Sequence, residues 1–291
     1  MHCRPHRAVR GALGALSFYV VVGCSASAVG PSAPPVDRAS DLGTPGSAAA
    51  MVVPGEWISG QIYILGIEAA TAEAWACQDD NDRLHTHLRA ESTGLLAWIK
   101  RAYMEQDTKL GSDDAFPRRN WADVQIGEKQ RRYDVRFYGG RYAYEYRRNY
   151  GPMIANTIRL GPDERAHDLL SAVLMLRAWR PPPGTHGHFT AVLGRWLWRT
   201  EVVFEGPDVV LREDGPYPAT KIIGTTQKQH PDPKERVGYD FELWFSDDPA
   251  RIPLRAKSGS ELGDIWLELT DYRNDRDRKC QPHKRIFDVS D

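Results

Sequence analysis

The 291-residue chain lacks the short motifs that mark most nucleotide-dependent enzymes. It contains no GxxxxGK[ST] phosphate loop, no GxGxxG dinucleotide fingerprint and no GxSxG nucleophile elbow. Its formal net charge is only −1, so no overall basic field exists to attract nucleic acid. We therefore predict no nucleic-acid partner and no cofactor, and we nominate no catalytic residue.

The N-terminus lacks acidic residues, since the first one is Asp37. Three arginines precede an uncharged, mostly apolar run at residues 11–23, which is shorter than the roughly 20 residues of a membrane span. A basic segment followed by a short apolar run is typical of an export signal, here residues 1–23. The residue that follows the apolar run decides how this signal would be cleaved.

The apolar run ends in Val-Val-Gly followed by Cys24, which resembles the bacterial lipoprotein box. We expect cleavage before Cys24 and acylation of this residue, so that the acyl chains anchor the protein in a membrane. Ser25 is not Asp, which favours the outer membrane, and the protein would face the periplasm of a bacterial cell envelope. The alternative is a plain secretory signal cleaved near residues 25–28.

Cysteine is scarce, with four residues in the whole chain. Cys3 leaves with the signal and Cys24 carries the acyl chains, so Cys77 and Cys280 remain. An even pair in an oxidising compartment predicts a disulfide between them, which would connect an early strand to the C-terminal tail. The alternative is two independent thiols.

The mature chain divides into three parts by composition. Residues 24–54 are rich in Ala, Ser, Gly and Pro and predict a flexible tether. Residues 55–272 alternate apolar and polar side chains with a period of two, which predicts many short strands joined by hairpin-length turns such as Gly139-Gly140. Residues 273–291 form a charged C-terminal tail.

One segment of this region, residues 163–179, has helical rather than period-two spacing. Leu169, Leu170, Val173 and Leu174 recur on one face, and three prolines at 181–183 end the segment. We therefore predict a mainly β fold, in which a strongly curved antiparallel sheet or partly open β-barrel packs around one amphipathic helix.

Asp247 and Asp248 lie between two strands in FELWFSDDPARIPLR, where Ser, Asp and Pro favour a turn. Two carboxylates at a solvated hairpin tip are poorly suited to acid–base catalysis, so we interpret them as structural. His85 and His87 share one face of a strand, as metal ligands do, but no third ligand is evident. We interpret them as structural or solvated and predict no metal site.

The segment RRYDVRFYGGRYAYEYRRNY, residues 131–150, mixes arginines with aromatic side chains. Arginine forks bind phosphate and tyrosine stacks on sugars, so the segment is a candidate surface for anionic lipid headgroups or envelope polysaccharide. The alternative is a hairpin whose wet face carries arginine. The arginines concerned are Arg131, Arg132, Arg136, Arg141, Arg147 and Arg148.

Three segments carry a family resemblance: GEWISGQIYILGIEAATAEAWA, the helix HDLLSAVLMLRAW, and the closing WFSDDPARIPLRAKSGSELGDIWLELTDY. In this order they resemble the bacterial envelope family catalogued as domain of unknown function 3108, over about residues 55–272. The resemblance implies an exported, β-rich protein and implies no catalytic residue. The chain departs from the family at Leu169, where Pro is frequent, and in the polar insert at 227–236 and the charged tail.

These observations favour a non-enzymatic, lipid-anchored envelope protein that binds an apolar or lipid-like ligand in its curved sheet. The first alternative is a structural or assembly module that binds envelope proteins or glycan. The second is a hydrolase with an unrecognised site.

We expect Cys24→Ala to move the protein from the membrane fraction to the soluble fraction, because the acyl chains provide the anchor. Fractionation of cells and immunoblotting measure this change. A variant that stays in the membrane fraction would contradict the lipoprotein interpretation.

Overall fold

The computed structural model describes residues 40–41, 48–79, 81, 83–161, 164–230, 237–260, 263–275 and 280. The predicted signal peptide and Cys24 lie outside these residues, as do most of the predicted tether and tail. Within the described part, no helix is both long enough and apolar enough to cross a membrane.

The described part of the chain is mostly strand. The first half contains β1 (Ser40–Asp41), β2 (Glu56–Ile64), β3 (Ile67–Gln78), β4 (Leu84–Ser92), α2 (Gly94–Ile99), β5 (Ala102–Leu110), β6 (Pro117–Ile126), β7 (Lys129–Tyr138), β8 (Arg141–Arg148) and β9 (Ile154–Arg159). The second half contains β10 (Ala166–His167), α3 (Leu169–Ala178), β11 (Thr185–Leu193), β12 (Trp196–Arg212), β13 (Gly215–Lys228), β14 (Gly238–Ser246), β15 (Pro253–Ser260) and β16 (Gly263–Asn274).

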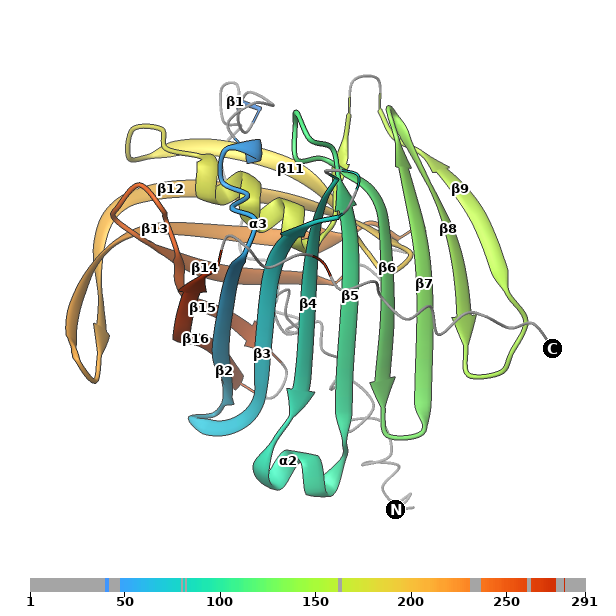
Figure 1. Ribbon diagram of the computed structural model, residues 1–291, viewed down its shortest axis with the longest axis horizontal. Helices are drawn as coiled ribbons and strands as arrows, with labels where there is room; N and C mark the ends of the chain where they lie inside the picture. The colour runs from blue at the N-terminus through green and yellow to red at the C-terminus, as the bar shows by residue number, and fades with distance from the viewer. Residues whose placement is uncertain are drawn as a thin grey trace, which may run out of the picture.

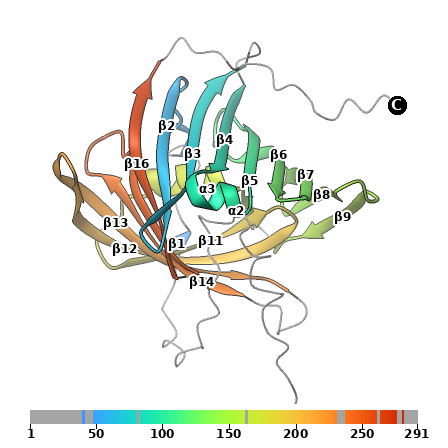
Figure 2. The ribbon, with the colours of Figure 1, turned by 90° about the horizontal axis from the view of Figure 1, so that it is seen from below.

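The strands of the described residues form one open, curved sheet of 16 strands (Figure 1). Strands β2 to β9 pair antiparallel in chain order, and so do β11 to β16. The two runs are joined where β16 pairs with β2, for example Ile265 with Ile64. Figure 2 shows the sheet curling around α3, so the predicted fold class is confirmed.

The period-two pattern decides which side chains face the helix. On β14, Phe241, Leu243 and Phe245 alternate toward the interior, where they form a buried cluster with Met175 and Leu176 of α3. Alternation of this kind is what a strand with one covered face requires.

Helix α3 begins at Leu169, later than the predicted start at residue 163. Asp168 is its N-cap: the carboxylate accepts from the Ser171 backbone N–H at 3.0 Å, and Ser171 Oγ accepts from the Asp168 N–H at 3.0 Å. This reciprocal capping box is worth about 1 kcal/mol and sets the first helical residue. Ala166 and His167 instead pair in parallel with β11.

Buried polar groups attach the N-terminal end of α3 to the sheet. Asp168 is 1% exposed and accepts hydrogen bonds from Gln106 at 2.7 Å, from Asn120 at 3.0 Å and from the Thr108 hydroxyl. These donors come from β5 and β6. A buried carboxylate is tolerated because its oxygens are hydrogen-bonded, so the network holds the helix at one place on the sheet.

The C-terminal end of α3 has a matching attachment. Arg177 makes a two-pronged ion pair with Glu56 at the start of β2, with N–O distances of 2.7 and 2.8 Å, and both side chains are buried. Arg177 also donates to the Ala250 carbonyl at 2.7 Å. Removing one partner of such a pair leaves an uncompensated buried charge, so the pair strongly restrains the helix.

The packed region begins earlier than residue 55, where we expected the tether to end. Ala48 and Val52 are buried in a cluster that includes Ala76 and Leu174. Ala48 and Val52 pack beside α3, a long-range contact that the composition of this stretch did not indicate.

His167 is fully enclosed between Phe116 and Phe189, and burial lowers its pKa from 6.5 to about 4. As the pH falls below 6.5 the unfolded chain therefore takes up the proton before the folded protein does. The folded state loses stability between pH 6.5 and about 4, by roughly 3 kcal/mol in total.

We expect His167→Phe to remove this part of the acid sensitivity, because no proton can then bind preferentially to the unfolded chain. Urea unfolding at several pH values between 4 and 7 measures it. His188→Phe, at an exposed position, is the control and should retain the wild-type slope. Equal slopes in His167→Phe and wild type would contradict the assignment.

Candidate functional site

A cavity of about 150 Å³ lies between α3 and the concave side of the sheet. It is partly open to solvent. Strands β2, β3, β4, β14, β15 and β16 contribute to its wall, which is predominantly apolar. The main apolar lining residues are Ile58, Ala72, Ala74, Leu88, Leu169, Leu170, Val173, Leu174, Leu243, Leu254, Leu267 and Leu269.

The cavity exists because small side chains face a helix that cannot move closer. Ala72 and Ala74 of β3 lie on the inner face, where larger residues would fill the space. Leu170 and Val173 on the facing side of α3 are only half-buried, although they lie inside the curved sheet. The attachments at Asp168 and Arg177 keep the helix from collapsing onto the alanines.

One end of the cavity is polar. Glu56 and Arg177 line it, and Arg177 Nε is buried without a hydrogen-bond partner among the described residues. The guanidinium already uses its two terminal nitrogens on Glu56 and Ala250. The residues around the cavity therefore combine an apolar wall with buried polar atoms that have hydrogen-bonding capacity left, namely Arg177 Nε, Arg255 Nε and Thr86 Oγ1.

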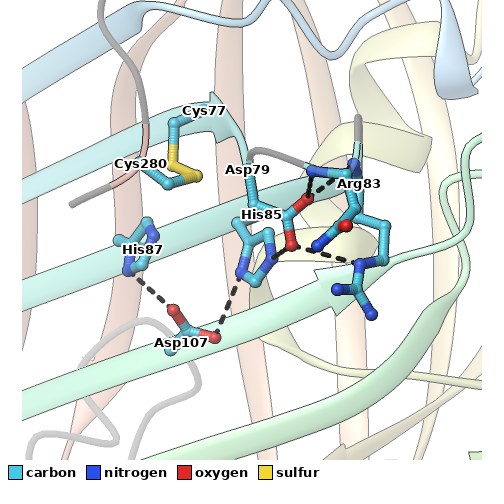
Figure 3. Close-up of a disulfide and its surroundings, with 8 residues drawn as sticks. Cys77, Asp79, Arg83, His85, His87, Asp107 and Cys280 are labelled. Atoms are coloured by element: carbon cyan, nitrogen blue, oxygen red, sulfur yellow. Dashed lines mark hydrogen bonds and ion pairs between the residues drawn. A yellow bond between two sulfur atoms is a disulfide. The ribbon is translucent and has the colours of Figure 1, made fainter. Parts of the chain in front are cut away.

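The predicted cysteine pair lies on the opposite, convex side of the sheet. The structure joins Cys77 of β3 to Cys280 in a disulfide (Figure 3). The Cys280 N–H also donates to the Gln78 carbonyl at 3.3 Å. The chain after β16 is thereby attached to the outer face of β3.

His85 and His87 lie beside this disulfide and are buried, not solvated (Figure 3). Asp107 of β5 faces both rings: its oxygens lie 3.5 Å from His85 Nδ1 and 3.0 Å from His87 Nδ1. Burial alone would raise the pKa of Asp107, but hydrogen bonds from the two histidines lower it overall. His186 and His188 lie on β11, away from this cluster in the sheet order.

Two groups of three potential ligands occur among the described residues, each with its atoms within 4.8 Å of one another. One is His85, His87 and Asp107, and the other is Cys77, His87 and Cys280. The sulfurs of the second group are bonded to each other, and a disulfide does not supply the thiolates that bind metals. The first group retains its donor atoms.

Asp247 and Asp248 form a hairpin tip, as predicted, between β14 and β15. Both are exposed, and Asp248 accepts from the backbone N–H groups of Ala250 and Arg251 at 2.7 and 3.1 Å. The sequence did not indicate that Arg251, just after this hairpin tip, is buried. It is 1% exposed and donates to Thr220 Oγ1 at 2.6 Å. Burial, with the neighbouring Arg180, lowers the pKa of Arg251 to about 10.

The six arginines of residues 131–150 do not share one face. Arg132, Arg136, Arg141 and Arg147 alternate with buried tyrosines and lie on one face of β7 and β8, whereas Arg131 and Arg148 lie opposite them. Asp123 pairs with Arg132 at 3.2 Å, which reduces the free positive charge. The anionic-ligand surface stays a prediction, with at most four of the six arginines on one side.

The fold and cavity define a β-barrel-like protein with a helix inside an open sheet. A crystal structure of a beta-barrel-like protein of domain of unknown function DUF1849 from Brucella abortus is similar, with a TM-score of 0.51 and 10% identity. The match covers 76% of this chain and 97% of that one, and it supports the fold alone.

Weaker similarity links the chain to two further structures. A protein described as exported, with a YmcC-like fold, from Bacteroides fragilis matches with a TM-score of 0.34 at 9% identity, and a protein described as a lipoprotein from Parabacteroides distasonis with 0.35 at 8%. Each covers 76% of this chain and 96% of the other. No curated protein sequence matches the chain.

Residues 59–270 match the family described as Protein of unknown function (DUF3108), which is most of the chain. The protein belongs to this family. The resemblance identified from the sequence is thus confirmed.

We expect the disulfide to stabilise the protein by roughly 2–4 kcal/mol, because it restricts the unfolded chain over a sequence separation of 203 residues. The Cys77→Ser/Cys280→Ser variant should unfold at correspondingly lower urea concentration. Intact mass should also rise by two hydrogens when the wild-type protein is reduced. An unchanged mass would contradict the pairing.

Proposed function

We propose that the protein is a lipid-anchored protein of the bacterial cell envelope that binds an apolar, lipid-like ligand beneath α3. The observation that carries the proposal is the apolar cavity between the helix and the concave sheet. The envelope location is supported by the export signal and by Cys24 at the end of its apolar run.

The size and lining of the cavity favour hydrocarbon over a polar ligand. An apolar cavity of about 150 Å³ stays dry and admits molecules such as benzene, so this one has room for a short length of acyl chain. Each methylene transferred from water contributes about 0.8 kcal/mol. Because the cavity is partly open, a longer chain can place its remainder outside.

The polar end suggests how such a ligand would be oriented. Arg177 Nε is an unused donor at the boundary of an apolar wall. A carboxylate or ester oxygen on the ligand would accept from it and satisfy a group that otherwise remains buried without a partner. We therefore favour an acyl compound with an oxygen-bearing end.

We expect Val173→Trp to fill the cavity and weaken binding of a fluorescent fatty acid at least tenfold, with the thermal unfolding temperature within a few degrees of wild type. Val209→Trp places the same side chain on β12, where Val209 is 53% exposed, and should bind like wild type. Titration monitored by fluorescence measures the affinity, and mass spectrometry of solvent extracts identifies lipid that copurifies.

Equal affinity in Val173→Trp and wild type would contradict the proposal. So would wild-type protein that neither copurifies with lipid nor binds the fatty acid. A folded Val173→Trp variant is required for the comparison, and Leu170→Phe provides a smaller obstruction at the same wall.

A further inference from the structure

His87 borders the cavity, but its ring, with the side chains of His85 and Asp107, lies on the Cys77 face of the sheet, opposite the apolar wall. The donor atoms of these three residues converge there. Period-two geometry places both histidines on the same face of β4, and the β4–β5 register sets Asp107 opposite His87. Figure 3 shows both rings directed at the Asp107 carboxylate, with Asp79 on the far side of His85. Two ring nitrogens and a carboxylate arranged in this way are a candidate site for a cation.

The hydrogen bonding of His85 is incomplete when the ring is neutral. Its Nε2 lies 3.3 Å from an Asp79 oxygen, and its Nδ1 lies 3.5 Å from an Asp107 oxygen. A neutral imidazole has one N–H, so only one carboxylate can accept from it, and the other faces a lone pair. A cation between Nδ1 and Asp107 would remove this conflict while Nε2–H continues to donate to Asp79.

The spacing of the three donors fits a small divalent cation. Zinc lies about 2.0–2.2 Å from histidine nitrogen and carboxylate oxygen, so tetrahedral ligand atoms are roughly 3.3 Å apart. The two nitrogen–oxygen distances here are 3.5 and 3.0 Å, one to each oxygen of Asp107. One donor atom from each of the three residues lies within 4.8 Å of the other two. Two histidines and one carboxylate form the three-ligand set of zinc sites that leave one position open.

The surroundings hold these donors in place. Asp79 is held beside His85 by hydrogen bonds from the backbone N–H groups of Arg83 and Asn81, at 3.0 and 2.9 Å. Trp75 stacks on His87 with ring centres 4.9 Å apart. His87 Nε2 has no hydrogen-bond partner among the described residues, so no other protein group there determines which ring nitrogen of His87 carries the hydrogen.

We propose that His85, His87 and Asp107 form a binding site for a divalent transition-metal ion of the zinc type. The metal is held by Nδ1 of each histidine and by the Asp107 carboxylate, and Asp79 orients His85 through Nε2–H, as carboxylates commonly do for metal-bound histidine. The disulfide at Cys280 places the end of the described chain next to the site, on the same face of the sheet (Figure 3).

The test uses the whole mature protein after treatment with a chelator and titration calorimetry with ZnCl₂. We expect about one equivalent of Zn²⁺ to bind and to raise the thermal unfolding temperature, because a ligand of the folded state stabilises it. Mg²⁺ should not bind, since it prefers oxygen ligands. Asp79→Asn should weaken zinc binding by about 10–100-fold, and His87→Gln and Asp107→Asn by more than this.

His186→Gln, on β11, is the matched control and should bind zinc like wild type. Unfolding curves in chelator show whether each variant remains folded. For wild type alone, long-range ¹H–¹⁵N spectra of the histidine rings should show zinc on Nδ1 of two residues, which does not depend on any variant.

Three results would overturn the proposal. The first is the absence of stoichiometric zinc binding to folded wild type, which would leave only a hydrogen-bonded His–Asp cluster. The second is undiminished binding in folded His87→Gln and Asp107→Asn. The third is zinc binding that is lost in Cys77→Ser/Cys280→Ser but retained in Asp107→Asn, which would assign the metal to the cysteines of the reduced protein.

Discussion

Helix α3 is ten residues long, and buried polar groups attach both of its ends to the sheet. At one end Asp168 accepts from side chains of β5 and β6, and at the other Arg177 pairs with Glu56 of β2. Apolar packing alone would draw the helix onto the alanines of β3, since close packing is favoured wherever it can be reached. The polar attachments instead set the distance between the helix and the sheet. The cavity, with its apolar wall and its polar end, results from that distance.

The sequence was sufficient for the features that depend on local pattern. Period-two alternation predicted the strands, Gly139-Gly140 a turn, and SerAspAsp a hairpin tip, because each depends on neighbouring residues only. The predicted helix start at residue 163 is too early. Asp168 sets the start instead, because its carboxylate accepts from the Ser171 N–H and also from Gln106 of the sheet.

The candidate sites depend on strand register, which the sequence does not specify so directly. The period-two pattern predicts strands throughout residues 55–272, yet a shift of one residue between β4 and β5 would move Asp107 to the other face, away from His85 and His87. Likewise, nothing near Arg177 indicates Glu56, because their contact spans 121 residues. The sequence shows that His85 and His87 share one face of a strand. The third potential ligand, Asp107, comes from the next strand, β5.

The pairing of β16 with β2 also has a consequence for the time order of folding. β2 is among the first strands to be synthesised, and its partner β16 is the last strand described. The edge of β2 that pairs with β16, for example at Ile64, therefore stays unpaired until Ile265 has been synthesised. Pairings between such distant segments make folding slow, because the chain loses much entropy before the contact forms. Until then the sheet has an uncovered strand edge on β2, which is a site for association between chains. The sheet is therefore continuous only when the last described strand has paired with one of the first.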